Sequence, residues 1–152
     1  MSFRSIPRED TALDWVSVRT VIETYMQSVD RKDGPAMLAT FADDAQAVYH
    51  SGNPEERTTR GGARIVDEIL ENIRTFTSSN HGISNFTMRI DGDTAHVDTF
   101  AIANVVIGNR MLVRGLRYQD IVGPSPKGLV IHRRVHTPLW QAETPTVPPR
   151  IG

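Results

Sequence analysis

The sequence contains no cysteine, and this absence excludes several kinds of chemistry. Disulfide bonds, thiolate nucleophiles and cysteine-based metal sites all require that residue. Metal and nucleotide motifs are missing too: there is no HExxH pattern, and the Gly61-Gly62 pair lacks the rest of a phosphate-binding loop. We therefore expect no metal ion and no cofactor. Any catalysis should rely on histidine, acidic, tyrosine, serine or arginine side chains.

Long apolar segments and an excess of one charge are also missing. No apolar run approaches the ~20 residues that span a bilayer, and the first ten residues, MSFRSIPRED, do not resemble a secretory signal. The formal net charge is only −1, which gives no reason to expect a nucleic-acid or membrane partner. These features favour a cytoplasmic protein.

The residues that are present are typical of one globular domain. The chain has 152 residues, of which 39% are hydrophobic and 23% are charged. This length suits a single domain with one core. Residues 143–152 are rich in proline and are expected to form an extended tail after a domain at 1–142.

The periodicity of apolar residues changes along the chain. A helix is expected at 10–31, where apolar residues recur at spacings of three and four and Thr11 with Asp14 resembles a capping box. Shorter helices are expected at 35–41 and 63–76. Strands are expected at five segments, separated by turn residues such as the loop at 51–54: 45–50, 83–90, 95–107, 111–122 and 129–136. Helices followed by hairpins indicate an α+β fold, with helices on one face of an antiparallel sheet and a cavity between the layers.

Asp30, His81 and Tyr25 are the most interesting polar residues. Asp30 lies at the edge of the apolar face of the first helix, near the helix C-terminus, where a carboxylate is unfavourable unless it has a role. His81 is expected in a loop just before a strand, a common place for functional residues. The alternatives are a solvated Asp30, an exposed His81, and a Tyr25 that is only a core aromatic.

Other candidates lie on the last strand. Arg134 is a candidate anchor for a carboxylate or an enolate, or alternatively part of a surface salt bridge. His132 and His136 share one face by alternation, but the pattern leaves open which of them faces a cavity.

The order and spacing of several short stretches resemble the SnoaL-like branch of the NTF2-like superfamily. The resemblance covers roughly residues 18–140, and the stretches that carry it are YMQSVDRKD, FADDA, RGGARIVDEI, SNHGISN, IDGDTAHVDTF, VRGLRYQDIV and KGLVIHRRVHTPLW. It implies a cone-shaped fold in which a curved antiparallel sheet is wrapped by about three helices. It also implies a homodimer.

The resemblance further implies site residues. Asp30 and His81 match the aspartate–histidine pair of the scytalone-type and bile-acid-type dehydratases, Tyr25 matches the tyrosine five residues before the aspartate, and Arg134 matches an arginine of the last strand. The dehydrochlorinase pattern has lysine where this chain has Tyr25, so that reaction is disfavoured. The expected substrate-binding residues are Arg134, Tyr49, Trp15, Asn85 and His132.

The resulting hypothesis is a cofactor-independent lyase or isomerase, that is, a dehydratase, double-bond isomerase or polyketide cyclase. Its substrate would be an apolar cyclic carbonyl compound, and His81 and Asp30 would supply acid–base chemistry. Two alternatives stay open: a non-catalytic binding or dimerisation module, and the small subunit of an aromatic-ring dioxygenase.

Overall fold

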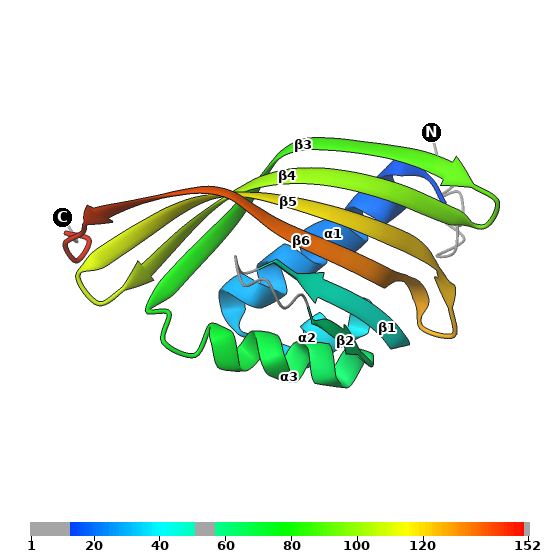
Figure 1. Ribbon diagram of the computed structural model, residues 1–152, viewed down its shortest axis with the longest axis horizontal. Helices are drawn as coiled ribbons and strands as arrows, with labels where there is room; N and C mark the ends of the chain where they lie inside the picture. Colours follow the sequence, from blue (N-terminus) through cyan, green and yellow to red (C-terminus); the bar gives the residue numbers. More distant parts are fainter. Residues whose placement is uncertain (1–12, 51–56, 151–152) are drawn as a thin grey trace, which may run out of the picture.

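The computed structural model describes residues 13–50 and 57–150, which form three helices and six strands. The helices are α1 (Trp15–Arg31), α2 (Gly34–Ala39) and α3 (Gly62–Asn72). The strands are β1 (Phe41–Tyr49), β2 (Thr58–Arg60), β3 (Ser78–Asp91), β4 (Thr94–Ile107), β5 (Arg110–Ser125) and β6 (Gly128–Pro145). The sheet is strongly curved, and the helices lie along its inner face (Figure 1). None of the described helices combines the length and apolar character needed to cross a membrane.

Helix α1 forms because its ends are capped and one of its faces is apolar. The Asp14 side chain accepts a hydrogen bond from the backbone N–H of Ser17, so Asp14 is the N-cap. At the other end, Lys32 adopts a left-handed conformation with φ of 53° and stops the helix. The apolar face is buried along its whole length: Val18, Ile22, Met26 and Val29. The expected capping box therefore does not start the helix; Thr11 lies outside the described residues.

The sheet has the strand order β2-β1-β6-β5-β4-β3. Strand β1 runs parallel to β6, and all the other neighbours are antiparallel. Register shifts mark an extra residue at Ser84 in β3 and at His132 and Leu139 in β6. Such bulges increase the local bend and twist of a sheet, and here they accompany the curvature that opens a space above the inner face.

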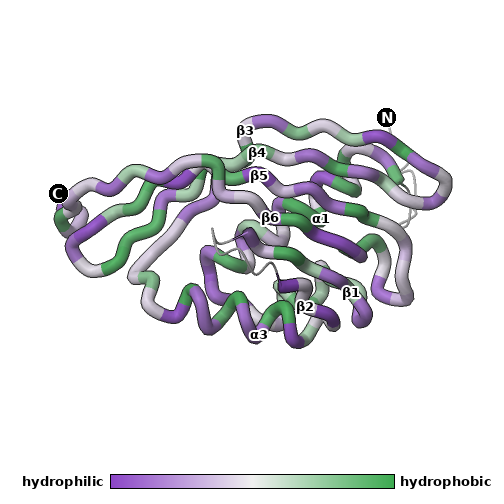
Figure 2. Tube along the Cα trace, viewed as in Figure 1, coloured by the Kyte–Doolittle hydropathy of each residue, from purple (hydrophilic) through white to green (hydrophobic). Residues whose placement is uncertain are grey.

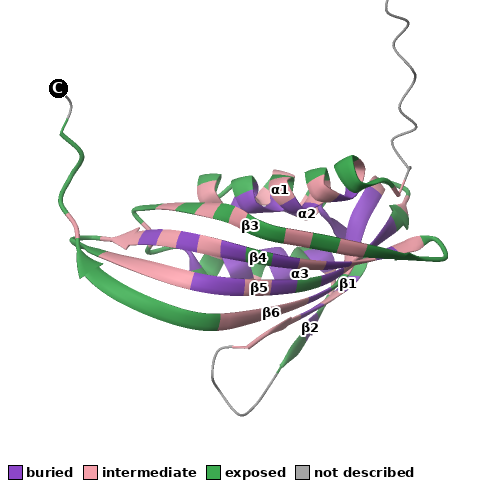
Figure 3. Cartoon of the chain, turned by 90° about the horizontal axis from the view of Figure 1, so that it is seen from above, coloured by how far each residue is buried: buried purple, intermediate pink, exposed green. Residues whose placement is uncertain are grey.

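The core fills the layer between the helices and the inner face of β4, β5 and β6. Polar and apolar residues alternate along the strands and around the turns of α3 (Figure 2). Buried residues lie on the central strands and on the helix sides that face them, whereas exposed residues gather on β3 and on the last part of β6 (Figure 3). The α+β class and the helix-covered curved sheet are thus confirmed.

Several element boundaries differ from those expected. Strand β3 begins at Ser78, so His81 lies inside a strand and not in the loop before it. Strand β6 runs on to Pro145, where it pairs with Arg110 of β5, so the first part of the expected tail belongs to the sheet. The short strand β2 was not expected, and the loop expected at 51–54 lies outside the described residues.

Candidate active site

The side chains of Asp30 and His81 meet where the end of α1 crosses β3. His81 Nδ1 lies 2.7 Å from Asp30 Oδ1, and the backbone N–H of His81 donates to Asp30 Oδ2 at 2.8 Å. The hydroxyl of Ser79, two residues earlier on the same face of β3, also donates to Asp30 Oδ1 at 2.8 Å. The imidazole is only 8% exposed and the carboxylate 19%. The two residues therefore form a partly buried dyad in which every Asp30 bond runs to β3.

A second contact fixes the end of α1 against the connection between α3 and β3. The Nζ of Lys32, the C-cap residue, donates to the carbonyl oxygens of Arg74 at 3.2 Å and of Phe76 at 2.7 Å. Phe76 lies two residues before the start of β3. The helix that carries Asp30 and the strand that carries His81 are thus held together at the dyad and again near Lys32, just beyond it.

These contacts determine the ionisation of Asp30 and the ring tautomer of His81. Burial raises the pKa of Asp30, but the hydrogen bonds from the His81 ring and backbone, the charge of His81 and the Ser79 hydroxyl outweigh burial and leave the pKa below its usual value. Asp30 is therefore an ionised, acceptor-only carboxylate at neutral pH. The Nδ1 atom of His81 must then carry a proton, which leaves Nε2 of the neutral ring unprotonated and available as a base.

His81 lines a cavity of about 380 Å³ between α1, α3 and the inner face of the sheet. Most of the surface of its wall is apolar, and seven apolar residues contribute to it: Val29, Ile69, Ile73, Phe76, Val105, Leu116 and Pro138. Its polar wall is formed by three tyrosines, three histidines, an asparagine and an arginine: Tyr25, Tyr49, Tyr118, His50, His81, His136, Asn72 and Arg114. A mostly apolar cavity with a few convergent polar groups is typical of a small-molecule site.

Two phenols lie together in the wall of this cavity. The hydroxyl oxygens of Tyr25 and Tyr49 are 3.5 Å apart, and Tyr25 is only 3% exposed. Burial, followed by the nearby Tyr25, raises the pKa of Tyr49 well above its usual value. Burial likewise raises the pKa of Tyr118. Tyr49 and Tyr118 therefore stay protonated and can donate hydrogen bonds at any ordinary pH.

Comparison with known proteins identifies the family. The sequence profile of the SnoaL-like domain matches residues 10–135. The chain belongs to the SnoaL-like family. An uncharacterized protein of Mycobacterium tuberculosis is 26% identical to it over 131 residues, which cover 84% of this chain and 87% of that protein.

Solved structures share the fold at low identity. A candidate scytalone dehydratase from Novosphingobium aromaticivorans superposes with a TM-score of 0.72 at 19% identity, covering 82% of this chain and 83% of that one. A type 2 hexachlorocyclohexane dehydrochlorinase gives a TM-score of 0.71 at 11% identity, with 89% and 90% covered. An NTF2-like protein with a cystatin-like fold, also from N. aromaticivorans, gives 0.67 at 19% identity, with 80% and 79% covered. These likenesses establish the NTF2-like fold.

Arg134 of the SnoaL-like chain lies behind the cavity wall. It is completely buried, and its guanidinium forms two hydrogen bonds to Asp120, at 2.7 and 2.8 Å. The guanidinium carbon also lies 3.9 Å from the centre of the Tyr25 ring. Burial lowers the pKa of Arg134, but the Asp120 carboxylate outweighs this and raises it. Arg134 therefore supports the ring of Tyr25 and does not reach the cavity itself, contrary to the expected anchoring role.

Three other residues expected to bind substrate do not line the cavity. Trp15, the first residue of α1, is 49% exposed and packs edge-on against Phe86 at a ring distance of 5.4 Å. Asn85 follows the bulge at Ser84 and pairs with Phe100, so it is turned to the outer face. His132 lies in the first bulge of β6, where its Nε2 is 3.1 Å from the carbonyl oxygen of Pro124. The bulges at Ser84 and His132 reverse the order of inward and outward side chains in β3 and β6.

His136, in contrast, does face the cavity. Its ring lies 4.8 Å from that of Tyr118 and 5.2 Å from that of Tyr49. Burial, and then the charges of Arg134 and Arg114, lower its pKa to about 3. His136 is therefore a neutral imidazole in the cavity wall. The question that the sequence left open between His132 and His136 is answered in favour of His136.

The sequence reasoning missed Asp120 and Arg114. Both side chains point to the inner face of β5, and their sequence neighbours point outward. In the sequence, however, a charged residue at every second position of a strand is normally interpreted as belonging to the exposed face. Among the described residues, no cluster of three or more histidine, aspartate or glutamate side chains is arranged to hold a metal ion.

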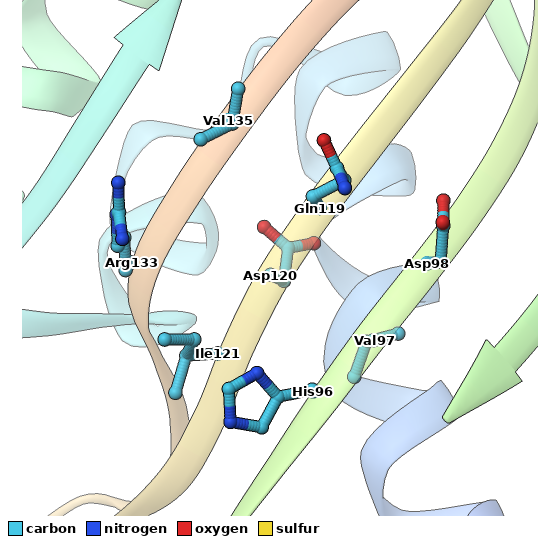
Figure 4. Close-up of a pocket in the computed structure, with 8 residues that line it drawn as sticks. All are labelled: His96, Val97, Asp98, Gln119, Asp120, Ile121, Arg133 and Val135. Carbon is cyan, nitrogen blue, oxygen red and sulfur yellow. The ribbon is translucent and has the colours of Figure 1, made fainter. Parts of the chain in front are cut away.

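A separate hollow of about 440 Å³ lies on the outer face of the sheet, over β4, β5 and β6 (Figure 4). His96, Asp98, Gln119 and Arg133 surround it. It contains no part of the dyad, so the candidate active site is the inner cavity.

Proposed function

We propose that this SnoaL-like protein is a cofactor-independent lyase or isomerase that acts on an apolar cyclic carbonyl compound. The observation that carries the proposal is the His81–Asp30 dyad at the wall of a mostly apolar cavity. A histidine with one nitrogen bonded to a carboxylate and the other free is equipped to remove a proton.

In the proposed reaction, Nε2 of His81 takes an acidic proton from the carbon next to the substrate carbonyl. The electron pair of the broken C–H bond moves into an enolate, and His81 becomes an imidazolium. The ionised carboxylate of Asp30, 2.7 Å away, stabilises that cation. Return of the proton to another carbon gives isomerisation, whereas delivery to a departing hydroxyl gives dehydration.

Tyr25 would stabilise the oxygen that gains charge. Its hydroxyl lies in the cavity wall 3.5 Å from that of Tyr49, and its ring is held by the buried Arg134. A phenol fixed in this way can donate a hydrogen bond to an enolate oxygen without reorganising.

The test measures proton abstraction directly and does not require the natural substrate. Exchange of the α-protons of 2-tetralone and similar cyclic ketones for deuterium is followed by NMR in D₂O. We expect the wild-type protein to accelerate the exchange and His81→Ala to lose roughly 10²–10⁴-fold of the rate. Asp30→Asn should lose nearly as much, because an amide does not stabilise imidazolium and can reverse the ring tautomer. Tyr25→Phe should be milder.

His132→Ala is the matched control, because His132 lies on the sheet but outside the cavity. It should keep the wild-type rate. Exchange by His81→Ala at the wild-type rate would refute the mechanism. No acceleration by the wild-type protein with any ketone of the panel would favour the non-catalytic alternative.

The proposed chemistry needs no metal. Exchange should therefore continue unchanged after dialysis against EDTA. Loss of the activity on chelation, with recovery when zinc or iron is added back, would contradict the acid–base mechanism.

A further inference from the structure

The inner cavity contains one cation that the proposed mechanism does not use. Among the described residues that line it, Arg114 is the only arginine or lysine, and there is no aspartate or glutamate. Its Nε atom is buried and has no hydrogen-bond partner among the described residues. The mechanism assigns roles to His81, Asp30 and Tyr25 but gives Arg114 none.

The other arginines of β5 are neutralised. Arg110 pairs with Glu143 at 2.7 Å, and Arg117 on the outer face pairs with Asp98. Arg114 forms no ion pair with an acidic side chain of the described part of the chain. Burying a charge costs free energy unless a partner compensates it. An unpaired guanidinium in a mostly apolar cavity therefore suits a ligand that brings the missing negative charge.

The strand register places Arg114 relative to the dyad. His81 pairs with Ala103 on β4, and Ala103 pairs with Arg114 on β5. The three residues thus form one row across three strands, so the backbones of His81 and Arg114 are roughly 10 Å apart. Both side chains line the same cavity, and Ala103 lies between the two residues in this row of the sheet.

We propose that Arg114 binds a carboxylate of the substrate, so that the substrate is an apolar ring compound with a carbonyl group near His81 and a carboxylate at the opposite end. The guanidinium can hold a carboxylate through two parallel hydrogen bonds. A ring system fills the apolar space between the two polar ends. This inference rests on the proposed function only in taking the inner cavity as the substrate site.

Electrostatics on the same wall supports this orientation. The charge of Arg114 contributes, after burial and Arg134, to the low pKa of the neighbouring His136. The neutral His136 thus adds no second positive charge to the wall, and Arg114 is left as the group that selects for an anion.

The experiment compares two ligands of one shape, 2-naphthoate and 2-naphthamide, by isothermal titration calorimetry. Wild-type protein should bind the carboxylate at least about tenfold more tightly than the amide. Arg114→Gln should weaken naphthoate binding about 10- to 100-fold and change naphthamide binding by less than about threefold. Arg114→Lys, which keeps the charge but not the planar fork, should fall in between.

Arg110→Gln is the matched control. It removes the same charge from the same strand, but Arg110 is exposed and lies outside the cavity. It should bind both ligands like the wild type. Circular dichroism checks that each variant is folded, and the preference of the wild-type protein is informative even if Arg114→Gln does not fold.

The outcomes separate this inference from the proposed function. His81→Ala should keep the preference for naphthoate even if it has lost proton exchange. The inference is overturned if the wild-type protein binds naphthoate no better than naphthamide or binds neither, or if a folded Arg114→Gln keeps the wild-type preference. None of these results bears on the exchange rates of the dyad variants.

Discussion

At the scale of single residues, the buried Arg134–Asp120 pair is the most demanding feature of the fold. Both side chains are 0% exposed, and Arg134 packs under the rings of Tyr25 and Tyr118. A buried charge without its partner is costly, whereas in the intact pair each charge is balanced by the other. The pair therefore couples the stability of the core to the position of a phenol in the candidate active site.

Replacing Asp120 by asparagine should show this coupling. We expect Asp120→Asn to lower the free energy of unfolding by about 3 kcal/mol or more, because it leaves Arg134 buried without its counter-charge. Asp98→Asn, which removes the carboxylate of the partly exposed pair with Arg117, should have only a small effect. Urea denaturation followed by circular dichroism measures both. Equal losses in the two variants would contradict the argument.

His136 should make the stability depend on pH. Its pKa is about 3 in the folded protein and 6.5 in the unfolded chain, because burial and the charges of Arg134 and Arg114 oppose its protonation. Between these values only the unfolded chain binds the proton. Stability contributed by the neutral ring is therefore complete above pH 6.5 and decreases as the pH falls, by at most about 1.4 kcal/mol per pH unit.

The variant His136→Phe keeps an aromatic ring but cannot titrate. Between pH 7.5 and pH 5, the wild-type protein should lose about 2 kcal/mol more unfolding free energy than His136→Phe does. Urea denaturation at the two pH values gives the unfolding free energy of each protein. The change between the two pH values is calculated for each protein separately, so that the effect of the substitution on packing cancels. The same loss in both proteins would show that His136 does not titrate on unfolding.

At the scale of elements, helix α3 depends on a glycine. Gly61 has φ of 95°, and Gly62 begins the helix directly against β1. A Cβ atom on Gly62 would lie 2.6 Å from the carbonyl oxygen of Ala42, a backbone atom that cannot rotate away. Because α3 supplies Ile69 and Asn72 to the cavity wall, this close approach also positions one wall of the site.

The variant Gly62→Ala should therefore destabilise the protein by about 1–3 kcal/mol. The matched control is Gly82→Ala on β3, where the nearest atom to an added Cβ is 3.9 Å away and φ is not positive. That change should be neutral or slightly stabilising, because alanine loses less backbone entropy than glycine on folding. Thermal unfolding compares the melting temperatures of the two variants with that of the wild type. A Gly62→Ala variant that melts at the wild-type temperature would contradict the prediction.

The elements also show what the sequence could predict. Helical spacing located α1, and the hairpin strands followed from alternation and turn residues. The dyad of Asp30 and His81 was expected from a family resemblance, and the structure brings the two residues to 2.7 Å. The directions of side chains were less predictable. A single extra residue in a strand, such as Ser84 or His132, reverses which face of the sheet each following side chain points to.

Charged residues inside the fold were hidden for a different reason. Asp120, Arg114 and Arg134 alternate along their strands in a way that also fits an exposed, solvated face. Only the pairing of Arg134 with Asp120 on the neighbouring strand shows that the charges are buried, and that pairing depends on the register between β5 and β6. Register is a long-range property that local periodicity does not contain.

At the scale of the whole molecule, the sheet has one face covered by helices and one face open (Figures 1 and 3). Beside its polar residues, the open face carries two large aromatic side chains: Phe100 is 36% exposed, and Trp140, which covers Gly115, is 49% exposed. Antiparallel sheets tolerate water on one face when that face is polar. An outer face with large aromatic residues is instead typical of an interaction surface.

We therefore expect two copies of the chain to pack through these outer faces as a two-fold dimer. Multi-angle light scattering at micromolar concentration should give twice the mass of one chain. Trp140→Arg or Phe100→Glu would place charge in the centre of a self-complementary contact and should produce monomers. Val16→Glu is the matched control, because Val16 is 45% exposed but lies on α1, on the other side of the sheet. It should remain dimeric.

A wild-type monomer, or a dimer that survives both outer-face changes, would rule out this mode of assembly. The dyad lies on the inner face, so dimer loss alone should leave the proton-exchange rate unchanged.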